Sequence, residues 1–192
     1  MAPVKAITLS LVLLAGVLAP LAPPARAQPV AGTATAAGSE ERVKAAYLFR
    51  VLNYVEFPPH SGERAAAPYV VGVLEDEIVA DDLAQQVAGK QVNGREVSVR
   101  RLAEGSALGG LDVLFIGRSQ RTRLPAILKQ LRSAPVLTVT ETADALEQGS
   151  IMNFRIVDGH VRFEISLPAA DKAGIRLSSR LLALAVKVLK AD

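Results

Sequence analysis

The sequence contains no cysteine and no tryptophan, and it has only two histidines. Without cysteine the chain can form no disulfide, no thiol nucleophile and no thiolate metal site. The two histidines, His60 and His160, belong to no H-x-x-H or carboxylate–histidine spacing, so zinc hydrolysis has little support. We therefore expect no bound metal and no cofactor.

The motifs of common enzymes are also missing. The sequence has no G-x-S-x-G motif of serine hydrolases and no G-x-G-x-x-G or G-K-[ST] motif of nucleotide-binding proteins. Ser119 follows a predicted strand, but the sequence places no histidine beside it. We therefore predict that the protein is not an enzyme.

The only long apolar run lies near the N-terminus. Lys5 precedes an uncharged apolar segment, residues 6–19, and a small-residue site follows at residues 25–27. This order is typical of a secretory signal peptide. The run is shorter than the roughly 20 apolar residues that span a membrane. We predict that residues 1–27 are a cleaved signal peptide, that no transmembrane segment remains, and that the protein resides in the periplasm.

The chain is nearly balanced in charge once this segment is removed. Of 22 basic residues, Lys5 and Arg26 lie in the predicted signal peptide, which leaves 20 basic against 19 acidic residues. A balanced charge does not favour nucleic acid as a partner. Half of all residues are hydrophobic, which favours a folded domain over disorder.

The remaining chain has the length of one domain. Residues 28–39 are small and polar and are predicted as a flexible linker, and residues 40–192 as the folded domain. Runs such as residues 69–74 (YVVGVL) are apolar throughout, as in strands buried on both faces of a parallel sheet. We predict a single α/β domain with a mixed, mostly parallel sheet, an antiparallel hairpin and helices on both faces.

Helical and strand patterns alternate along this domain. We predict helices over residues 39–56, 78–88, 125–132, 143–148 and 179–190, and strands over residues 69–74, 96–102, 112–117 and 136–140. Ser39 and Ser178 are the expected N-caps of the first and last helix. Asn93-Gly94 predicts a tight hairpin turn before the strand at residues 96–102.

A second hairpin, residues 151–166, carries the strongest local pattern. Asp158-Gly159 predicts a two-residue turn, which fixes the pairing register of the two strands. One face is apolar and predicted as core: Met152, Phe154, Ile156, Val161, Phe163 and Ile165. The other face carries the candidate partner-binding residues: Asn153, Arg155, Arg162 and Glu164. Arginine directly opposite arginine is unfavourable, which suggests either a solvated face or a contact with an acidic partner or another subunit.

An alternative site lies at the carboxyl ends of the predicted parallel strands. Open α/β sheets bind ligands there. The acidic run 75–77 and the basic turn 118–123 occupy such ends, although both patterns are common in solvated loops. If the protein is instead the small-ligand-binding domain of a sensory system, the candidate residues are Glu75, Arg118, Ser119 and Arg121.

Several segments together resemble the YfiR family of periplasmic proteins. The likeness is carried by residues 44–49 (KAAYLF), 53–58 (NYVEFP), 89–95 (GKQVNGR), 124–128 (LPAIL), 135–139 (PVLTV), 152–154 (MNF), 161–165 (VRFEI) and 178–182 (SSRLL). Phe57 stands where the family often has tryptophan. The cysteine pairs of some members are absent, so redox control through them is not available to this chain.

The resemblance implies a non-enzymatic regulator. Such proteins are similar to a repressor that contacts the periplasmic domain of a membrane-bound diguanylate cyclase, and release of that cyclase raises cyclic-di-GMP and favours biofilm. We accordingly expect the partner to be the periplasmic domain of an inner-membrane sensor or diguanylate cyclase. A homodimer is left open, and no nucleic acid is expected.

Overall fold

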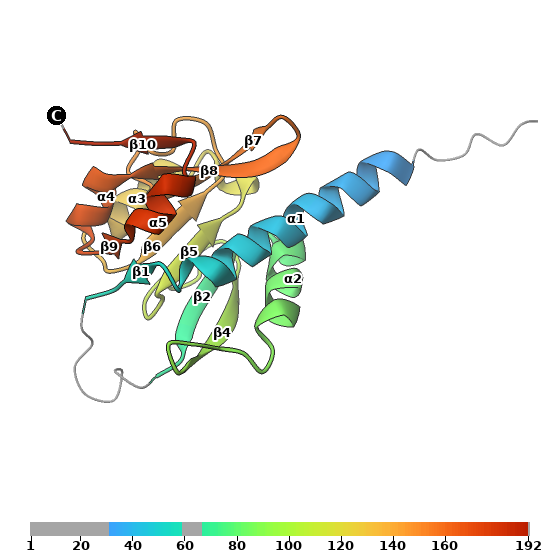
Figure 1. Ribbon diagram of the computed structural model, residues 1–192, viewed down its shortest axis with the longest axis horizontal. Helices are drawn as coiled ribbons and strands as arrows, with labels where there is room; N and C mark the ends of the chain where they lie inside the picture. Colours follow the sequence, from blue (N-terminus) through green and yellow to red (C-terminus); the bar gives the residue numbers. More distant parts are fainter. Residues whose placement is uncertain (1–30, 59–66, 192) are drawn as a thin grey trace, which may run out of the picture. The chain divides into compact units, whose positions relative to one another are not determined.

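The computed structural model describes residues 31–58 and 67–191, with side chains from residue 40 onward. The predicted signal peptide, the first residues of the predicted linker and His60 lie outside the described residues. The described chain is one α/β unit with helices on both faces of a mixed sheet, as predicted. Figure 1 shows the helices and strands along the chain.

The main sheet of the described residues has eight strands in the order β10-β8-β7-β6-β5-β2-β4-β3. The strands are β2 (Tyr69–Leu74), β3 (Gln91–Val92), β4 (Arg95–Leu102), β5 (Val113–Ile116), β6 (Leu137–Thr140), β7 (Met152–Val157), β8 (His160–Ser166) and β10 (Lys187–Leu189). The pairs β3–β4 and β7–β8 are antiparallel and the other neighbours are parallel. A separate antiparallel pair joins β1 (Val55–Glu56) to β9 (Arg176–Leu177).

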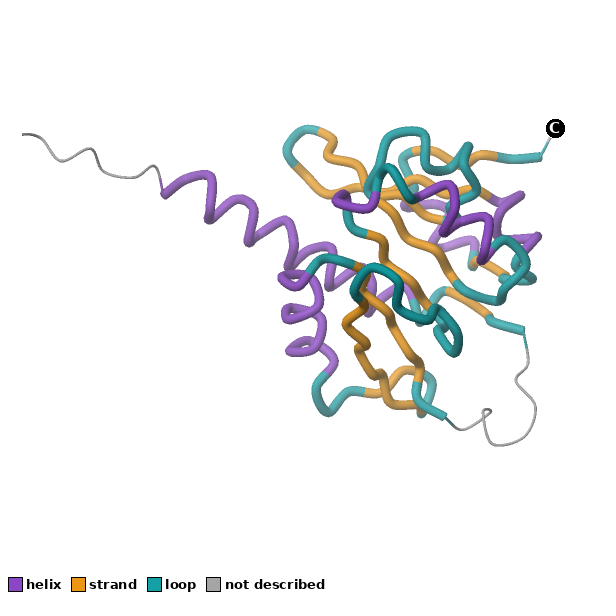
Figure 2. Tube along the Cα trace, turned by 180° about the vertical axis from the view of Figure 1, so that it is seen from behind, coloured by secondary structure: helices purple, strands orange, loops and turns teal. Residues whose placement is uncertain are grey.

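Alternation along the central strands divides the core between the two faces of the sheet. Val113 and Phe115 face α1 (Ala31–Val51) and α2 (Glu77–Val87), whereas Leu114 and Ile116 face α3 (Leu124–Leu131). The short helices α4 (Leu167–Lys172) and α5 (Ser179–Leu184) also pack on the first face. Helices α1 and α2 lie side by side in both views (Figures 1 and 2).

The first helix is displaced from its predicted bounds. It begins at Ala31, inside the stretch predicted as linker, so Ser39 is not its N-cap. Four alanines among residues 31–39 explain the earlier start, because alanine is the strongest helix former. The helix ends at Val51 instead of continuing to residue 56, and Val55 pairs with Leu177 of β9.

Two later helices differ more strongly from the prediction. Residues 143–148 form turns, and Asp144 has a φ of 59°, which an α-helix does not contain. The last helix begins as predicted, since the Ser178 side chain accepts a hydrogen bond from the Leu181 backbone. It ends at Leu184, because residues 187–189 extend as β10 beside β8. Both β10 and α4 were missed.

The hairpin of β7 and β8 has the predicted register throughout, from Val157 opposite His160 to Met152 opposite Ile165. Asp158 and Gly159 both have positive φ, as the predicted turn requires. The predicted core residues are buried except Ile156, which is 48% exposed. The prediction for Ile156 was wrong because β6 pairs only with Met152 and Asn153, so the outer half of β7 extends beyond the sheet.

Candidate functional site

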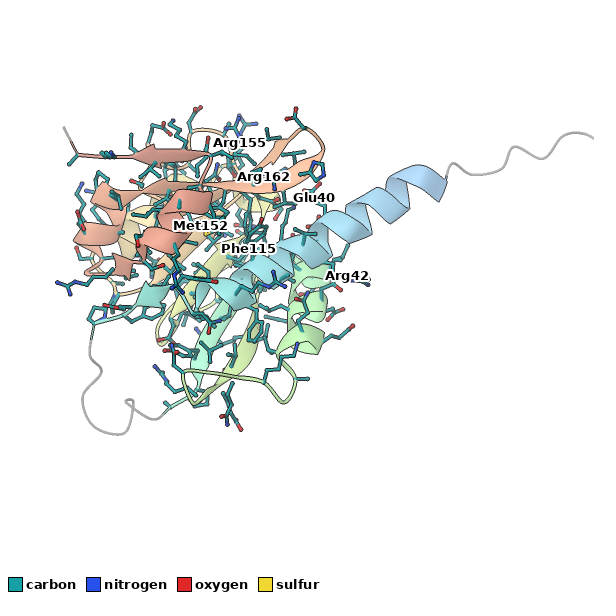
Figure 3. All side chains as sticks on the ribbon, viewed as in Figure 1. Glu40, Arg42, Phe115, Met152, Arg155 and Arg162 are labelled. Atoms are coloured by element: carbon teal, nitrogen blue, oxygen red, sulfur yellow. The ribbon has the colours of Figure 1, made fainter. Side chains whose placement is uncertain are left out.

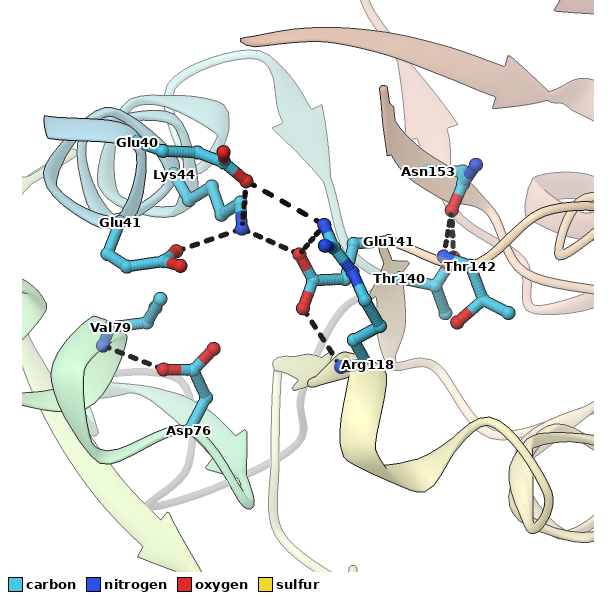
Figure 4. Close-up of polar contacts among 10 residues, drawn as sticks. All are labelled: Glu40, Glu41, Lys44, Asp76, Val79, Arg118, Thr140, Glu141, Thr142 and Asn153. Carbon is cyan, nitrogen blue, oxygen red and sulfur yellow. Dashed lines mark hydrogen bonds and ion pairs between the residues drawn. The ribbon is translucent and has the colours of Figure 1, made fainter. Parts of the chain in front are cut away.

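A cluster of charged side chains lies where α1 crosses the carboxyl ends of the parallel strands. We call it the charged cluster; its residues are Glu40, Glu41, Lys44, Arg118 and Glu141 (Figure 4). Arg118 follows β5 and Glu141 follows β6, so both lie at the edge where open α/β sheets hold ligands. The three α1 residues come within one turn of helix, because residues three and four apart share a face.

Lys44 is the centre of the charged cluster. It is only 2% exposed, and its Nζ lies 2.7 Å from Glu40, 2.9 Å from Glu41 and 2.6 Å from Glu141. Burial alone would lower the pKa of Lys44, but hydrogen bonds to the three carboxylates outweigh it, so this pKa is raised. Lys44 therefore stays charged in its buried position.

Glu141 joins α1 to the loop after β5. One of its oxygens accepts from Lys44, and the other accepts from the Arg118 backbone at 2.9 Å. The Arg118 guanidinium also lies 3.2 Å from Glu141 and 3.7 Å from Glu40. The Arg118 side chain is 64% exposed, so it forms the outer rim of the cluster.

Two carboxyls at the cluster have raised pKa values. Burial is the main cause for Glu41, and its contact with Lys44 offsets only part of that effect. Burial also raises the pKa of Asp76, which caps α2 by accepting a hydrogen bond from the Val79 backbone at 3.0 Å. The ionised forms of Glu41 and Asp76 are therefore disfavoured, and Lys44 offsets this effect only in part.

The predicted partner-binding residues separate into one buried and three accessible positions. Asn153 is 1% exposed, and its Oδ1 accepts from the Thr140 hydroxyl at 2.8 Å and from the Thr142 backbone at 3.1 Å (Figure 4). Its amide donates to Glu164 at 3.4 Å. Asn153 thus lies beneath the surface, where it can position Glu164.

The accessible positions form what we call the hairpin surface: Arg155, Arg162 and Glu164, with Val157 on the same face of the hairpin. Arg155 and Arg162 are exposed and lie directly opposite each other, near the upper edge of Figure 3. Glu164 relieves their repulsion weakly, because it lies 3.9 Å from Arg155. Val157 is 39% exposed on this face, whereas Ile156, which is 48% exposed, points to the opposite face of the hairpin. The hairpin surface therefore combines positive charge with the exposed apolar side chain of Val157.

The predicted ligand-binding residues are only partly brought together. The Ser119 hydroxyl donates to the Glu75 backbone oxygen at 3.3 Å, and Arg118 precedes Ser119 in the same turn. The Glu75 carboxylate accepts from the Glu104 backbone, and the Arg118 guanidinium is paired with Glu141. The Glu75 carboxylate and the Arg118 guanidinium therefore already have partners within the protein. No described contact joins Arg121 to Glu75, Arg118 or Ser119.

A hollow of about 170 Å³ lies between the charged cluster and the hairpin surface. Its lining includes Glu40, Lys44, Arg118, Glu141, Arg155 and Ile156. Among residues 40–58 and 67–191, no group of three metal-ligating side chains is found. Over the same residues, no helix has the length and apolar character needed to cross a membrane.

Sequence reasoning missed the charged cluster. The helical pattern leaves Lys44 off the apolar stripe of the first predicted helix, and polar residues there are usually solvated. The spacing of Glu40 and Glu41 from Lys44 could have indicated local ion pairs. Nothing in the sequence could have indicated Glu141, which tertiary folding brings to Lys44.

Comparison with known proteins gives a family match and several structural similarities, two of which are described below. A family model described as YfiR/HmsC-like (DUF4154) matches residues 41–186. A conserved domain protein of Vibrio cholerae has a similar fold, with a TM-score of 0.51 and 12% identity over 77% of this chain and 60% of that chain. The ABC domain in complex with L-Trp from Streptococcus pneumonia gives a TM-score of 0.48 and 12% identity, over 63% of this chain and 55% of that one. This chain thus spans less than two thirds of either structure.

Proposed function

Because the chain belongs to the YfiR/HmsC-like family, we propose that it is a non-enzymatic periplasmic regulator that represses a membrane-bound diguanylate cyclase. Family membership supports a periplasmic role in cyclic-di-GMP signalling in general terms. We propose more specifically that the protein binds the periplasmic part of the cyclase and so lowers cyclic-di-GMP. In this proposal residues 1–27 direct export and residues 40–192 form the regulatory domain.

The hairpin surface is the observation that carries the proposed contact. Arg155 and Arg162 face each other without a strong counter-charge, which is a local cost that an acidic partner would relieve. The exposed Val157, on the same face, supplies apolar area. Arginine and apolar side chains are both common in protein interfaces. We propose that Arg155, Arg162 and Glu164 contact the partner. The buried Asn153 positions Glu164 through its hydrogen bond.

A charge reversal within this surface tests the proposal. Arg162→Glu places a carboxylate opposite Arg155, so the hairpin should keep its fold while it loses its positive charge. Cells lacking the protein should contain more cyclic-di-GMP, wild-type protein should restore the low level, and Arg162→Glu should not. Arg132→Glu, which reverses an exposed charge directly after α3, is the matched control and should restore it.

Two results would contradict the proposal. An unchanged cyclic-di-GMP level after deletion would exclude the repressor role. Equal restoration of repression by Arg162→Glu and Arg132→Glu would exclude the hairpin surface as the contact. A thermal melt of each purified variant separates lost binding from lost folding.

A further inference from the structure

The α1–α2 pair carries a second surface feature that the hairpin proposal does not use. An open groove of about 500 Å³ runs between the outer sides of these two helices. Its lining includes Arg42, Val43, Ala46, Tyr47 and Arg50 of α1 and Gln85 of α2. Figure 3 shows Arg42 on the side of α1 next to α2 and Glu40 on the other side of α1, where it contacts Lys44 of the charged cluster. The groove and the charged cluster therefore occupy different sides of α1.

The floor of the groove is apolar and fixed. Val43 is 39% exposed although it lies beside buried helix positions. The Tyr47 ring is held from below, at 5.5 Å from Phe163 and 5.9 Å from Phe154, so it cannot turn away from the floor. Such a preformed apolar floor can bury a partner's side chains without first rearranging.

The polar groups of the groove favour a negatively charged occupant. Asp82, the acidic residue in the lining, lies 3.6 Å from Arg42, and its side chain is only 14% exposed. The Arg42 side chain is 75% exposed, and Arg50 is exposed with no ion pair to any described residue. The groove thus presents two accessible guanidinium groups and no comparably accessible carboxylate. Carboxylates of a partner complement this arrangement.

The spacing of the two arginines indicates the shape of the occupant. Arg42, Ala46 and Arg50 are four residues apart along α1, so they share a face and span about 12 Å at 1.5 Å per residue. Two turns of a second helix cover the same length, with apolar anchors at i, i+3 or i+4, and i+7. We propose that the α1–α2 groove docks an acidic amphipathic helix of a protein partner, with apolar anchors on Val43, Ala46 and Tyr47 and carboxylates on Arg42 and Arg50.

This proposal goes beyond the repressor function and does not depend on it. The test uses the protein purified as cells export it and two synthetic helical peptides of about five turns, long enough to be helical on docking. Both peptides have the same leucine face; one has glutamates and the other lysines along its flanks. Fluorescence anisotropy of the peptide measures binding. Changes in the amide chemical shifts of the isotope-labelled protein, observed by NMR, locate the bound peptide.

The acidic peptide should bind and should shift amides of residues 42–50 and 82–86, whereas the lysine peptide should not bind. The double variant Arg42→Gln, Arg50→Gln should weaken binding roughly fivefold, as expected for the loss of two exposed ion pairs. Val43→Ser should weaken it as well. The matched controls Arg132→Gln and Val186→Ser change exposed residues elsewhere and should leave binding unchanged.

Equal binding of both peptides, no binding of the acidic one, or shifts confined to the hairpin surface would each overturn the proposal. Arg162→Glu separates the two proposals, because it should abolish repression and leave peptide binding intact. Both groove variants change exposed positions and should fold normally, which a thermal melt checks. If Arg162→Glu loses repression but the wild-type protein does not bind the acidic peptide, the groove proposal is rejected and the repressor proposal stands.

Discussion

The charged cluster makes a quantitative prediction about Lys44. Lys44→Met keeps a long, flexible side chain but removes the ammonium group that lies 2.6–2.9 Å from three carboxylates. Glu141 is 4% exposed, and Glu40 and Glu41 are 28% and 19% exposed, so water can replace the lost cation only in part. Breaking a buried ion pair from one side costs about 3–5 kcal/mol, and we expect Lys44→Met to lie in this range at pH 7.

The assay is urea unfolding followed by circular dichroism, with the midpoint converted through an unchanged slope. Lys187→Met is the matched control, because Lys187 and Glu147 form an exposed pair at 3.3 Å. Removing such a pair costs only about 0.2–1 kcal/mol. Lys44→Met combined with Glu141→Gln should recover part of the loss, since one uncompensated buried charge is then removed.

The pH dependence gives an independent check of the same reasoning. Burial raises the pKa of Glu41, and Lys44 offsets part of this effect, so Lys44→Met should raise the pKa of Glu41 further. Stability of the variant should therefore increase as pH falls through this raised value, and its deficit relative to wild type should shrink. A loss no larger than that of Lys187→Met, or a deficit independent of pH, would refute Lys44 as the electrostatic centre of the cluster.

Three further predictions concern other parts of the molecule. Arg162→Glu should raise the free energy of unfolding by about 0.2–1 kcal/mol in urea, because it replaces a repulsive cross-strand pair with Arg155 by an attractive one; a decrease would contradict the observed register. Glu41 has a pKa raised above its ordinary 4.5 mainly by burial, so wild type should lose stability relative to Glu41→Gln as pH rises from 4.5 through the raised value. Urea midpoints across this window measure the effect, and identical curves would exclude it. Gly72→Ala should lose about 1–3 kcal/mol in a thermal melt, because its Cβ would lie 2.8 Å from a Leu102 methyl carbon; an unchanged melt would show that the core yields there.

The sequence predicted best those elements whose pattern is local. The Asp158-Gly159 turn and the alternation around it predicted every pair of the hairpin, because a two-residue turn leaves one register. The apolar run Tyr69–Leu74 predicted a buried parallel strand in the same way. In both cases the neighbouring residues contain all the information that the element needs.

The sequence-based predictions were wrong where contacts with distant segments determine the local structure. Residues 185–190 have a helical apolar pattern, but the exposed edge of β8 takes up Lys187–Leu189 as a strand. Ile156 continues an apolar face, but it extends beyond the last residue that β6 covers. The local pattern predicts Lys44 as a surface residue, because only tertiary folding brings Glu141 beside it. Each error has the same cause, which is a tertiary partner far away in sequence.

The pairing of β1 with β9 has a consequence for the order of folding. Val55 of β1 pairs with Leu177 of β9, so this contact spans most of the described chain. A contact between residues so far apart in sequence slows folding, because a long loop must close before it forms. During synthesis from the N-terminus, β1 therefore has no partner strand until Arg176 and Leu177 have been made, and the fold is completed only late.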